Sequence, residues 1–147
     1  MKDYKKLNVY LSDLAVMNTK LHNLHWNVEG RNFYQTHKFT EGLYETFFEW
    51  VDEVAEAIRM REAYPFASLK EYLENATIKE VSSKAISVDE VNETIMEDLV
   101  KIKDEATALR NEADEEGDFT LVSLLEDQVA EMQKNIWFLK ASKPCCK

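Results

Sequence analysis

Two of the three histidines, His25 and His37, lie in a stretch of the chain that is rich in carboxylates. Glu41 follows His37 by four residues, and Glu56 follows Asp52 by the same interval. Residues four apart on a helix share one face, so each of these pairs would present its two side chains together. Imidazole and carboxylate groups are ligands for first-row transition metals. This stretch is therefore a candidate metal site.

One helix cannot bring all of these groups to a single ion. His37 and Asp52 are 15 positions apart (52 − 37), which corresponds to about 22 Å along a helix axis. In angle, however, the ligands stay together. With His37 at zero, Glu41 falls near 40°, Asp52 near 60° and Glu56 near 100°, whereas the apolar stripe centres near about 290°. The helix would carry two ligand clusters on one face beside the core.

A second copy of this helix could combine the two clusters. Antiparallel packing about a twofold axis would place His37 and Glu41 of one subunit beside Asp52 and Glu56 of the partner subunit. The axis would pass near residues 46–48, and Phe48 projects from the same face. His25 precedes this helix by a short turn and could complete the histidine half. The bundle-type site within one subunit uses Glu-x-x-His motifs, and the sequence contains none.

Apolar residues recur at helical spacing along most of the chain, and four long helices are predicted from them. The first spans about residues 4–27, and the second spans about residues 33–63 and ends at Pro65. A crossover of about residues 65–87 follows and contains a short helix opened by the capping box Ser68-Leu-Lys-Glu71. A second capping box begins the third helix. Gly117 ends that helix, and Asp118 is the expected N-cap of the fourth.

The inner faces of the later helices follow the same spacing. In the second helix the stripe contains either Trp50 or Val51. The expected core positions of the last three helices are Leu43, Phe47, Val54 and Ile58, then Val88, Val91, Ile95, Leu99, Ile102, Ala106, Leu109 and Ala113, then Leu121, Leu125, Val129, Met132, Ile136 and Leu139. Gly42, in the middle of the second helix, could mark the close approach of another backbone.

Short turns with one long crossover describe an all-α, ferritin-like four-helix bundle. We expect one domain over residues 1–147, with short flexible tails at about 1–3 and 141–147. Three glycines and two prolines are too few for the many turns of an all-β fold.

The net charge of the chain indicates which kinds of molecule it can bind. The formal net charge is −10, so the surface should repel phosphate backbones and attract cations. The sequence shows no apolar run of membrane-spanning length and no secretory signal, so a cytoplasmic protein is expected. Cys145 and Cys146 are adjacent near the end of the chain, where a tail without a role and a soft-metal or redox role are both open.

Residues 25–56 resemble the signature of Dps proteins, also called miniferritins or DNA-binding proteins from starved cells. The matching pattern is His25-Trp26-Asn27-x-x-Gly30-x-x-Phe33-x-x-x-His37-x-x-x-Glu41-x-x-Tyr44, followed by Asp52-Glu53-Val54-Ala55-Glu56. The likeness extends over essentially the whole chain. One departure lies at the end of the second helix, where the family commonly has Leu-Gly-Gly and this chain has Arg61-Glu62-Ala63.

The resemblance implies a hollow dodecamer built from twofold dimers, with intersubunit ferroxidase centres for iron. His25, His37 and Glu41 of one subunit would face Asp52 and Glu56 of its neighbour. The family oxidises Fe(II), preferentially with hydrogen peroxide, and stores the ferric mineral inside the shell. Such a protein removes both reagents of hydroxyl-radical chemistry.

Two other functions stay open: compaction of DNA, and a structural bundle whose polar face only mediates dimerisation. We expect no DNA binding, because this chain lacks the long lysine-rich tail that DNA-binding members of the family usually carry. His22 is read as structural or solvated. Trp26 is read as a packing residue or as a radical quencher beside the site. The acids of residues 112–118 are read as a solvated helix end or as a pore lining.

Overall fold

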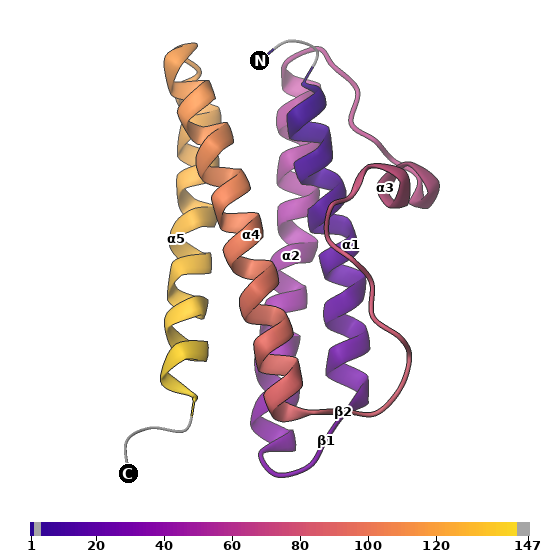
Figure 1. The fold of residues 1–147 in the computed structure, drawn as a ribbon. Coiled ribbons are helices and arrows are strands. Elements are labelled where there is room, and N and C mark those ends of the chain that lie inside the picture. The colour runs from indigo at the N-terminus through magenta and orange to yellow at the C-terminus, as the bar shows by residue number, and fades with distance from the viewer. Residues whose placement is uncertain (2–3, 144–147) are drawn as a thin grey trace. The chain divides into compact units, whose positions relative to one another are not determined.

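The computed structural model describes Met1 and residues 4–143, and its regular structure is almost entirely helical (Figure 1). Two compact units are distinguished, Met1–Val91 and Asn92–Lys147. The long helices are α1 (Lys5–Asn27), α2 (Phe33–Met60), α4 (Val88–Glu115) and α5 (Phe119–Ala141), and the short helix α3 (Leu69–Asn75) lies in the crossover. Every expected helix is therefore present. Cys145 and Cys146 lie outside the described residues.

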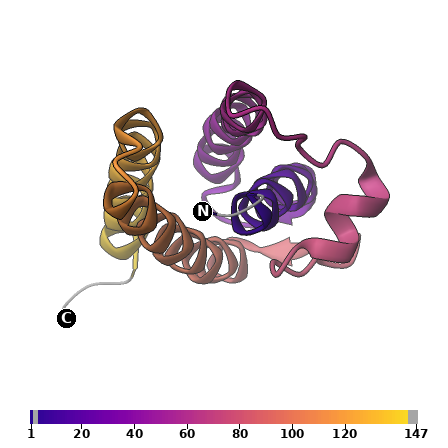
Figure 2. The same cartoon turned by 90° about the horizontal axis from the view of Figure 1, so that it is seen from above.

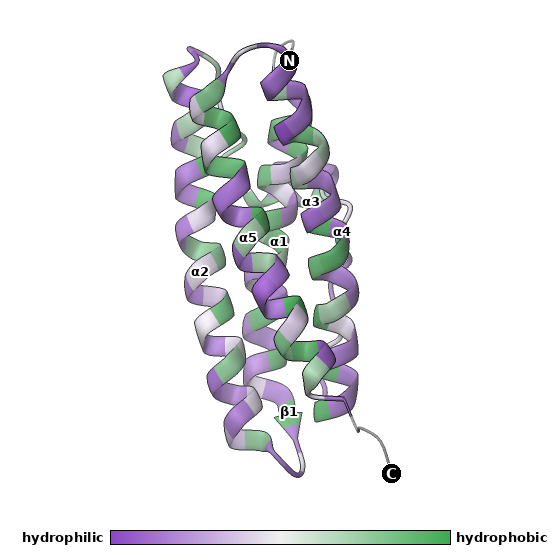
Figure 3. Cartoon of the chain, turned by 90° about the vertical axis from the view of Figure 1, so that its left-hand side faces the viewer, coloured by the Kyte–Doolittle hydropathy of each residue, from purple (hydrophilic) through white to green (hydrophobic). Residues whose placement is uncertain are grey.

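In the first unit, α1 and α2 run antiparallel, side by side (Figure 1). The predicted stripe of α2 is buried, and Trp50 rather than Val51 belongs to it, since Trp50 is 7% exposed and Val51 only half-buried. A Cβ added at Gly42 would meet no atom within 4 Å, so no backbone segment among the described residues approaches there. Hydrophobic and hydrophilic bands alternate along each long helix, as expected for amphipathic helices (Figure 3).

The crossover follows α1 because buried polar side chains of that helix bind its backbone. Asn8 accepts from the Phe66 N–H at 2.8 Å and donates to the Tyr64 carbonyl at 3.2 Å. Asp13, which is fully buried, accepts from the Ile78 N–H at 2.9 Å and also binds the N–H and hydroxyl of Thr77. These anchors place α3 beside α1, as seen from above in Figure 2.

A two-residue parallel strand pair, which the sequence did not predict, closes the other end of the crossover. Strand β1 (Val28–Glu29) follows α1, and β2 (Ile86–Ser87) precedes α4, with Val28 paired to Ile86. Gly30 then turns the chain into α2 with a φ of 113°, a conformation that favours glycine.

The caps show how local sequence sets the starts of three helices, α3, α4 and α5. Ser68 accepts from the Glu71 N–H at 3.2 Å, and Glu71 accepts from the Ser68 hydroxyl at 2.8 Å. Ser87 caps α4 through the Glu90 N–H, and Asp118 caps α5 through the Leu121 N–H. All three caps confirm the sequence prediction.

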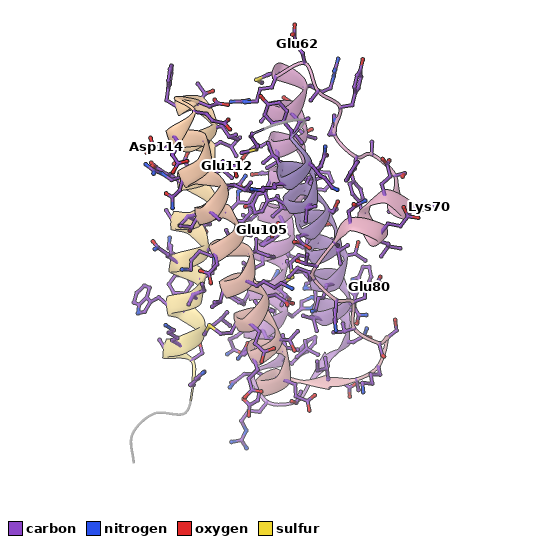
Figure 4. All side chains as sticks on the ribbon, turned by 45° about the horizontal axis from the view of Figure 1, so that its top comes forward. Glu62, Lys70, Glu80, Glu105, Glu112 and Asp114 are labelled. Atoms are coloured by element: carbon purple, nitrogen blue, oxygen red, sulfur yellow. The ribbon has the colours of Figure 1, made fainter. Side chains whose placement is uncertain are left out.

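The predicted end of α2 is wrong. The helix ends at Met60 and not at about residue 63, so Pro65 does not terminate it. The Ala63 N–H donates to the Ile58 carbonyl and the Glu62 N–H to the Arg59 carbonyl, which is the Schellman pattern of hydrogen bonds. Glu62 adopts a φ of 63°, the left-handed conformation that such a motif requires. The side chain of Glu62 stands at this helix end in Figure 4.

In the second unit, α4 and α5 run antiparallel and are joined through Gly117, which has a φ of 74° (Figures 1 and 2). The Arg110 Nε donates to Glu126 across the two helices at 2.8 Å, and Arg110 also pairs with Asp114 at 3.3 Å. The predicted core stripe of each helix is buried except that Val88 and Val129 are half-buried.

Candidate metal centre

The two histidines of the predicted site lie against each other where α1 ends and α2 begins. The imidazole rings of His25 and His37 stack with centroids 3.6 Å apart and planes 15° apart. His25 is the last buried side chain of α1 and is 4% exposed, whereas His37 is half-buried in the first turns of α2. The short turn between the helices thus brings together two predicted ligands that are 12 positions apart in the chain (37 − 25).

Each histidine is held by the backbone of the other. The Nδ1 of His25 lies 2.7 Å from the His37 carbonyl oxygen, and the Nδ1 of His37 lies 2.9 Å from the His25 carbonyl oxygen. A carbonyl oxygen only accepts hydrogen bonds, so both Nδ1 atoms donate their protons. In the neutral rings, both Nε2 atoms therefore keep a lone pair for a metal ion.

Burial also favours the neutral ligand form of His25. The loss of solvation lowers the pKa of His25 from its ordinary value of 6.5, and the charges of His37 and His22 act in the same direction. The hydrogen bond to the His37 carbonyl and the charge of Glu41 raise it, but they do not overcome burial.

Glu41 lies one turn after His37 on α2, as its spacing predicted, and its charge acts on His25. Its carboxylate is also 3.7 Å from the ammonium group of Lys38, and its side chain is 36% exposed. A metal ion would compete with this lysine for the carboxylate.

Asp52 and Glu56 are not brought to the histidines within the subunit. Both are exposed, further along α2. Among the described residues, no group of three or more His, Cys, Asp or Glu side chains is placed to hold a metal ion. The subunit therefore brings the two histidines together but groups neither Glu41 nor the later carboxylates with them as metal ligands.

A groove with a volume of about 720 Å³ lies beside Asp52, between α1, α2 and α3. Its apolar lining includes Phe48, Val51, Leu69 and Tyr72. Phe48 is 71% exposed and Leu69 is 78% exposed, so large exposed apolar side chains line the same groove as Asp52.

The remaining candidates have structural contacts. The Nδ1 of His22 donates to the Asn18 carbonyl oxygen at 2.7 Å, and the His22 ring stacks on Tyr44 with centroids 3.9 Å apart. Tyr44 in turn meets His25 edge-on at 5.1 Å. Trp26 is 68% exposed and so is not a core residue of this subunit.

Sequence reasoning missed Thr40. Its hydroxyl oxygen lies 3.0 Å from the Nδ1 of His25, and the side chain is completely buried. The signal was its place one turn after His37, but the contact depends on how α1 packs against α2.

The comparisons with known proteins identify the class. A family model described as a ferritin-like domain matches residues 4–142, so the chain is a ferritin-like protein with the all-α, four-helix-bundle fold predicted from its sequence. The DNA protection during starvation protein of Helicobacter pylori is 36% identical over 141 residues, which cover 96% of this chain and 98% of that relative.

Solved structures narrow the assignment. The crystal structure of Helicobacter cinaedi CAIP has a TM-score of 0.93 and 34% identity, and the match covers 97% of this chain and 100% of that one. A Dps protein from Bacillus brevis has a TM-score of 0.89 and 34% identity, over 92% of this chain and 91% of that one. The chain belongs to the Dps, or miniferritin, family. No described helix has both the length and the apolar character needed to cross a membrane.

Proposed function

We propose that this protein oxidises Fe(II), preferably with hydrogen peroxide, and stores the ferric product inside a hollow shell in the cytoplasm. Each ferroxidase centre would combine His25, His37 and Glu41 of one subunit with Asp52 and Glu56 of the partner subunit. The chain would act as one domain, and twelve copies would form the shell from twofold dimers. Family membership supports this function, and the ligand arrangement supports the shared site.

The observation that carries the proposal is the pair of stacked imidazoles. Their Nδ1 atoms are bonded to carbonyl oxygens at 2.7 and 2.9 Å, so their Nε2 atoms are directed by the fold and not by the metal. Two oriented imidazoles and one adjacent carboxylate form an incomplete ligand set. An incomplete set within the subunit is what a site completed by a partner requires.

An exposed apolar residue on α2 supports the proposal that a partner subunit supplies the remaining ligands. Phe48 lies between the two ligand pairs along the helix and is 71% exposed. Antiparallel packing of α2 against its copy would cover Phe48 and bring each histidine half to a carboxylate half. The apolar groove beside Asp52 would be covered in the same contact.

The ligand types suit the chemistry. Imidazole and carboxylate ligands bind Fe(II) and leave positions open for an oxidant. Two Fe(II) ions each lose one electron, and peroxide accepts both electrons as its O–O bond breaks. The carboxylates supply negative charge that favours Fe(III), and a net charge of −10 attracts the Fe(II) substrate to the protein.

The test is to add Fe(II) anaerobically, then peroxide, and to follow ferric absorbance. The wild type should oxidise iron rapidly, and the double variant His37→Ala/Asp52→Ala should not. Equal fast oxidation by both proteins would refute the site. Metal bound between two subunits in a crystal soaked with Fe(II) would exclude the alternative of a structural bundle without metal chemistry.

DNA protection is the second candidate, because the Helicobacter pylori relative is named for it. The net charge of −10 favours indirect protection through removal of iron and peroxide over binding to the phosphate backbone. A gel shift at low and at moderate salt separates the two. We expect no shift at moderate salt, and a shift that persists there would establish direct binding.

A further inference from the structure

Thr40, which is buried, contacts the imidazole of His25. Its Oγ1 lies 3.0 Å from the Nδ1 of His25, 2.9 Å from the Thr36 carbonyl oxygen and 3.0 Å from the His37 carbonyl oxygen. The side chain of Thr40 has no exposed surface. A buried hydroxyl is thus fixed between the helix backbone and the ring.

The donors and acceptors around the Nδ1 of His25 allow only one assignment of the hydrogen-bonding protons. A hydroxyl has one proton, and here that proton is donated to a backbone carbonyl within the same helix. The lone pairs of Oγ1 then face the Nδ1 proton of His25. With the His37 carbonyl at 2.7 Å, Nδ1 has two acceptors, so its proton is held and the plane of the ring is defined.

We propose that Thr40 is a positioning residue, whose hydroxyl orients the His25 ring so that its Nε2 lone pair is presented to the metal. This role rests on the proposed function, since it assumes that His25 is a ligand. Thr40 itself touches no metal. It acts through His25, in the manner of the outer groups that orient metal-bound histidines in other proteins.

Three substitutions at position 40 separate the effect of the hydroxyl's hydrogen bond from the effect of the space that it fills. Serine keeps the hydroxyl, alanine removes it and leaves space, and valine replaces it with a methyl group. A methyl group needs about 3.5 Å or more from a ring atom, so valine at the 3.0 Å position would displace the His25 ring. Thr36 provides the matched control. Its hydroxyl also donates to a carbonyl one turn back, that of Asn32 at 3.0 Å, and the residue is also buried, at 6% exposed.

The experiment is a Co(II) titration of the intact, metal-free protein, followed by the visible d–d absorption of the bound ion. Thr40→Val and Thr40→Ala should bind Co(II) about tenfold more weakly than the wild type, the lower end of the effect expected for groups that orient a ligand, since the His37 carbonyl remains. Their d–d bands should also change. Thr40→Ser should restore both affinity and spectrum, and Thr36→Val should match the wild type.

His37→Ala identifies the signal that belongs to this site. If His37→Ala leaves the wild-type titration unchanged, the histidine site itself is wrong, and the role of Thr40 is overturned with it. If His37→Ala abolishes the signal but Thr40→Val and Thr40→Ala behave as Thr36→Val does, only the role of Thr40 is overturned.

Discussion

The two ends of α2 carry two predicted ligands each, but the fold holds them differently. At the start of the helix, His37 stacks on His25 at 3.6 Å, and both rings are bonded to backbone carbonyls. Toward the end, Asp52 and Glu56 are exposed and make no hydrogen bond or ion pair with any described residue.

This difference separates what one subunit can do alone from what needs a second. The histidine half is oriented by packing between α1 and α2, so it exists in the isolated fold. The carboxylate half is solvated until another surface covers it. The proposed site, divided in this way, would couple metal binding to assembly, because neither half has enough ligands by itself.

The largest effect is expected when two inactive variants are mixed. His37→Ala retains the carboxylate half, and Asp52→Ala retains the histidine half. After denaturation and joint refolding in equal amounts, half of the dimers should be mixed, and each should contain one complete site of two, which gives about a quarter of the wild-type ferroxidase rate. Each variant refolded alone is the control. No recovery in the mixture would show that both halves serve one subunit.

The second test uses the lowered pKa of His25 in the folded, metal-free protein. A protonated His25 is disfavoured by burial, so below pH 6.5 the unfolded state binds more protons than the folded state. Stability should therefore fall as pH decreases from about 7 toward 5. His25→Asn, which keeps a donor but does not titrate, should show a shallower fall in urea unfolding. Parallel pH profiles for the two proteins would contradict this reading.

The third test concerns the end of α2 beyond the carboxylates. Glu62 adopts a left-handed conformation that costs a non-glycine residue about 1–2 kcal/mol. Glycine removes this cost, but it also raises the conformational entropy of the unfolded chain, which offsets part of the stabilisation. Glu62→Gly should therefore raise the free energy of unfolding by about 0.5–1 kcal/mol.

Its control is Glu53→Gly, at an exposed position within the same helix, which should lower that free energy by about 1 kcal/mol. Iron oxidation should be unchanged by Glu62→Gly. A loss of stability in this variant would mean that the Glu62 side chain contributes more than its backbone strain costs.

The smallest effect is expected from Lys38, which pairs with Glu41 at 3.7 Å and is 52% exposed. Lys38→Met frees the carboxylate, and since exposed pairs are weak, Co(II) affinity should rise by only about two- to threefold. Lys70→Met removes a comparable exposed pair with Glu74 on α3, a helix that carries no predicted ligand, and should leave the affinity unchanged. Weaker binding by Lys38→Met would show that Lys38 supports the site.

Much of the fold could be predicted because its signals are local. Ser68, Ser87 and Asp118 cap their helices through N–H groups three residues away, so short stretches of sequence determine these boundaries. The end of α2 could not be predicted in this way. Pro65 is a strong helix breaker, but the chain leaves the helix earlier, at a glutamate in a conformation usually taken by glycine. The available signal was the Leu-Gly-Gly that the family commonly carries where this chain has Arg61-Glu62-Ala63.

For the metal centre, the sequence by itself determined that α2 cannot build one site, because 15 residues at 1.5 Å each separate its two ligand pairs by about 22 Å. It also determined which residue types are available. Only the tertiary structure decided how His25 and His37 are oriented. Their mutual carbonyl bonds and the Thr40 contact depend on the packing of α1 against α2, and spacing along the chain does not define which ring nitrogen faces a backbone oxygen.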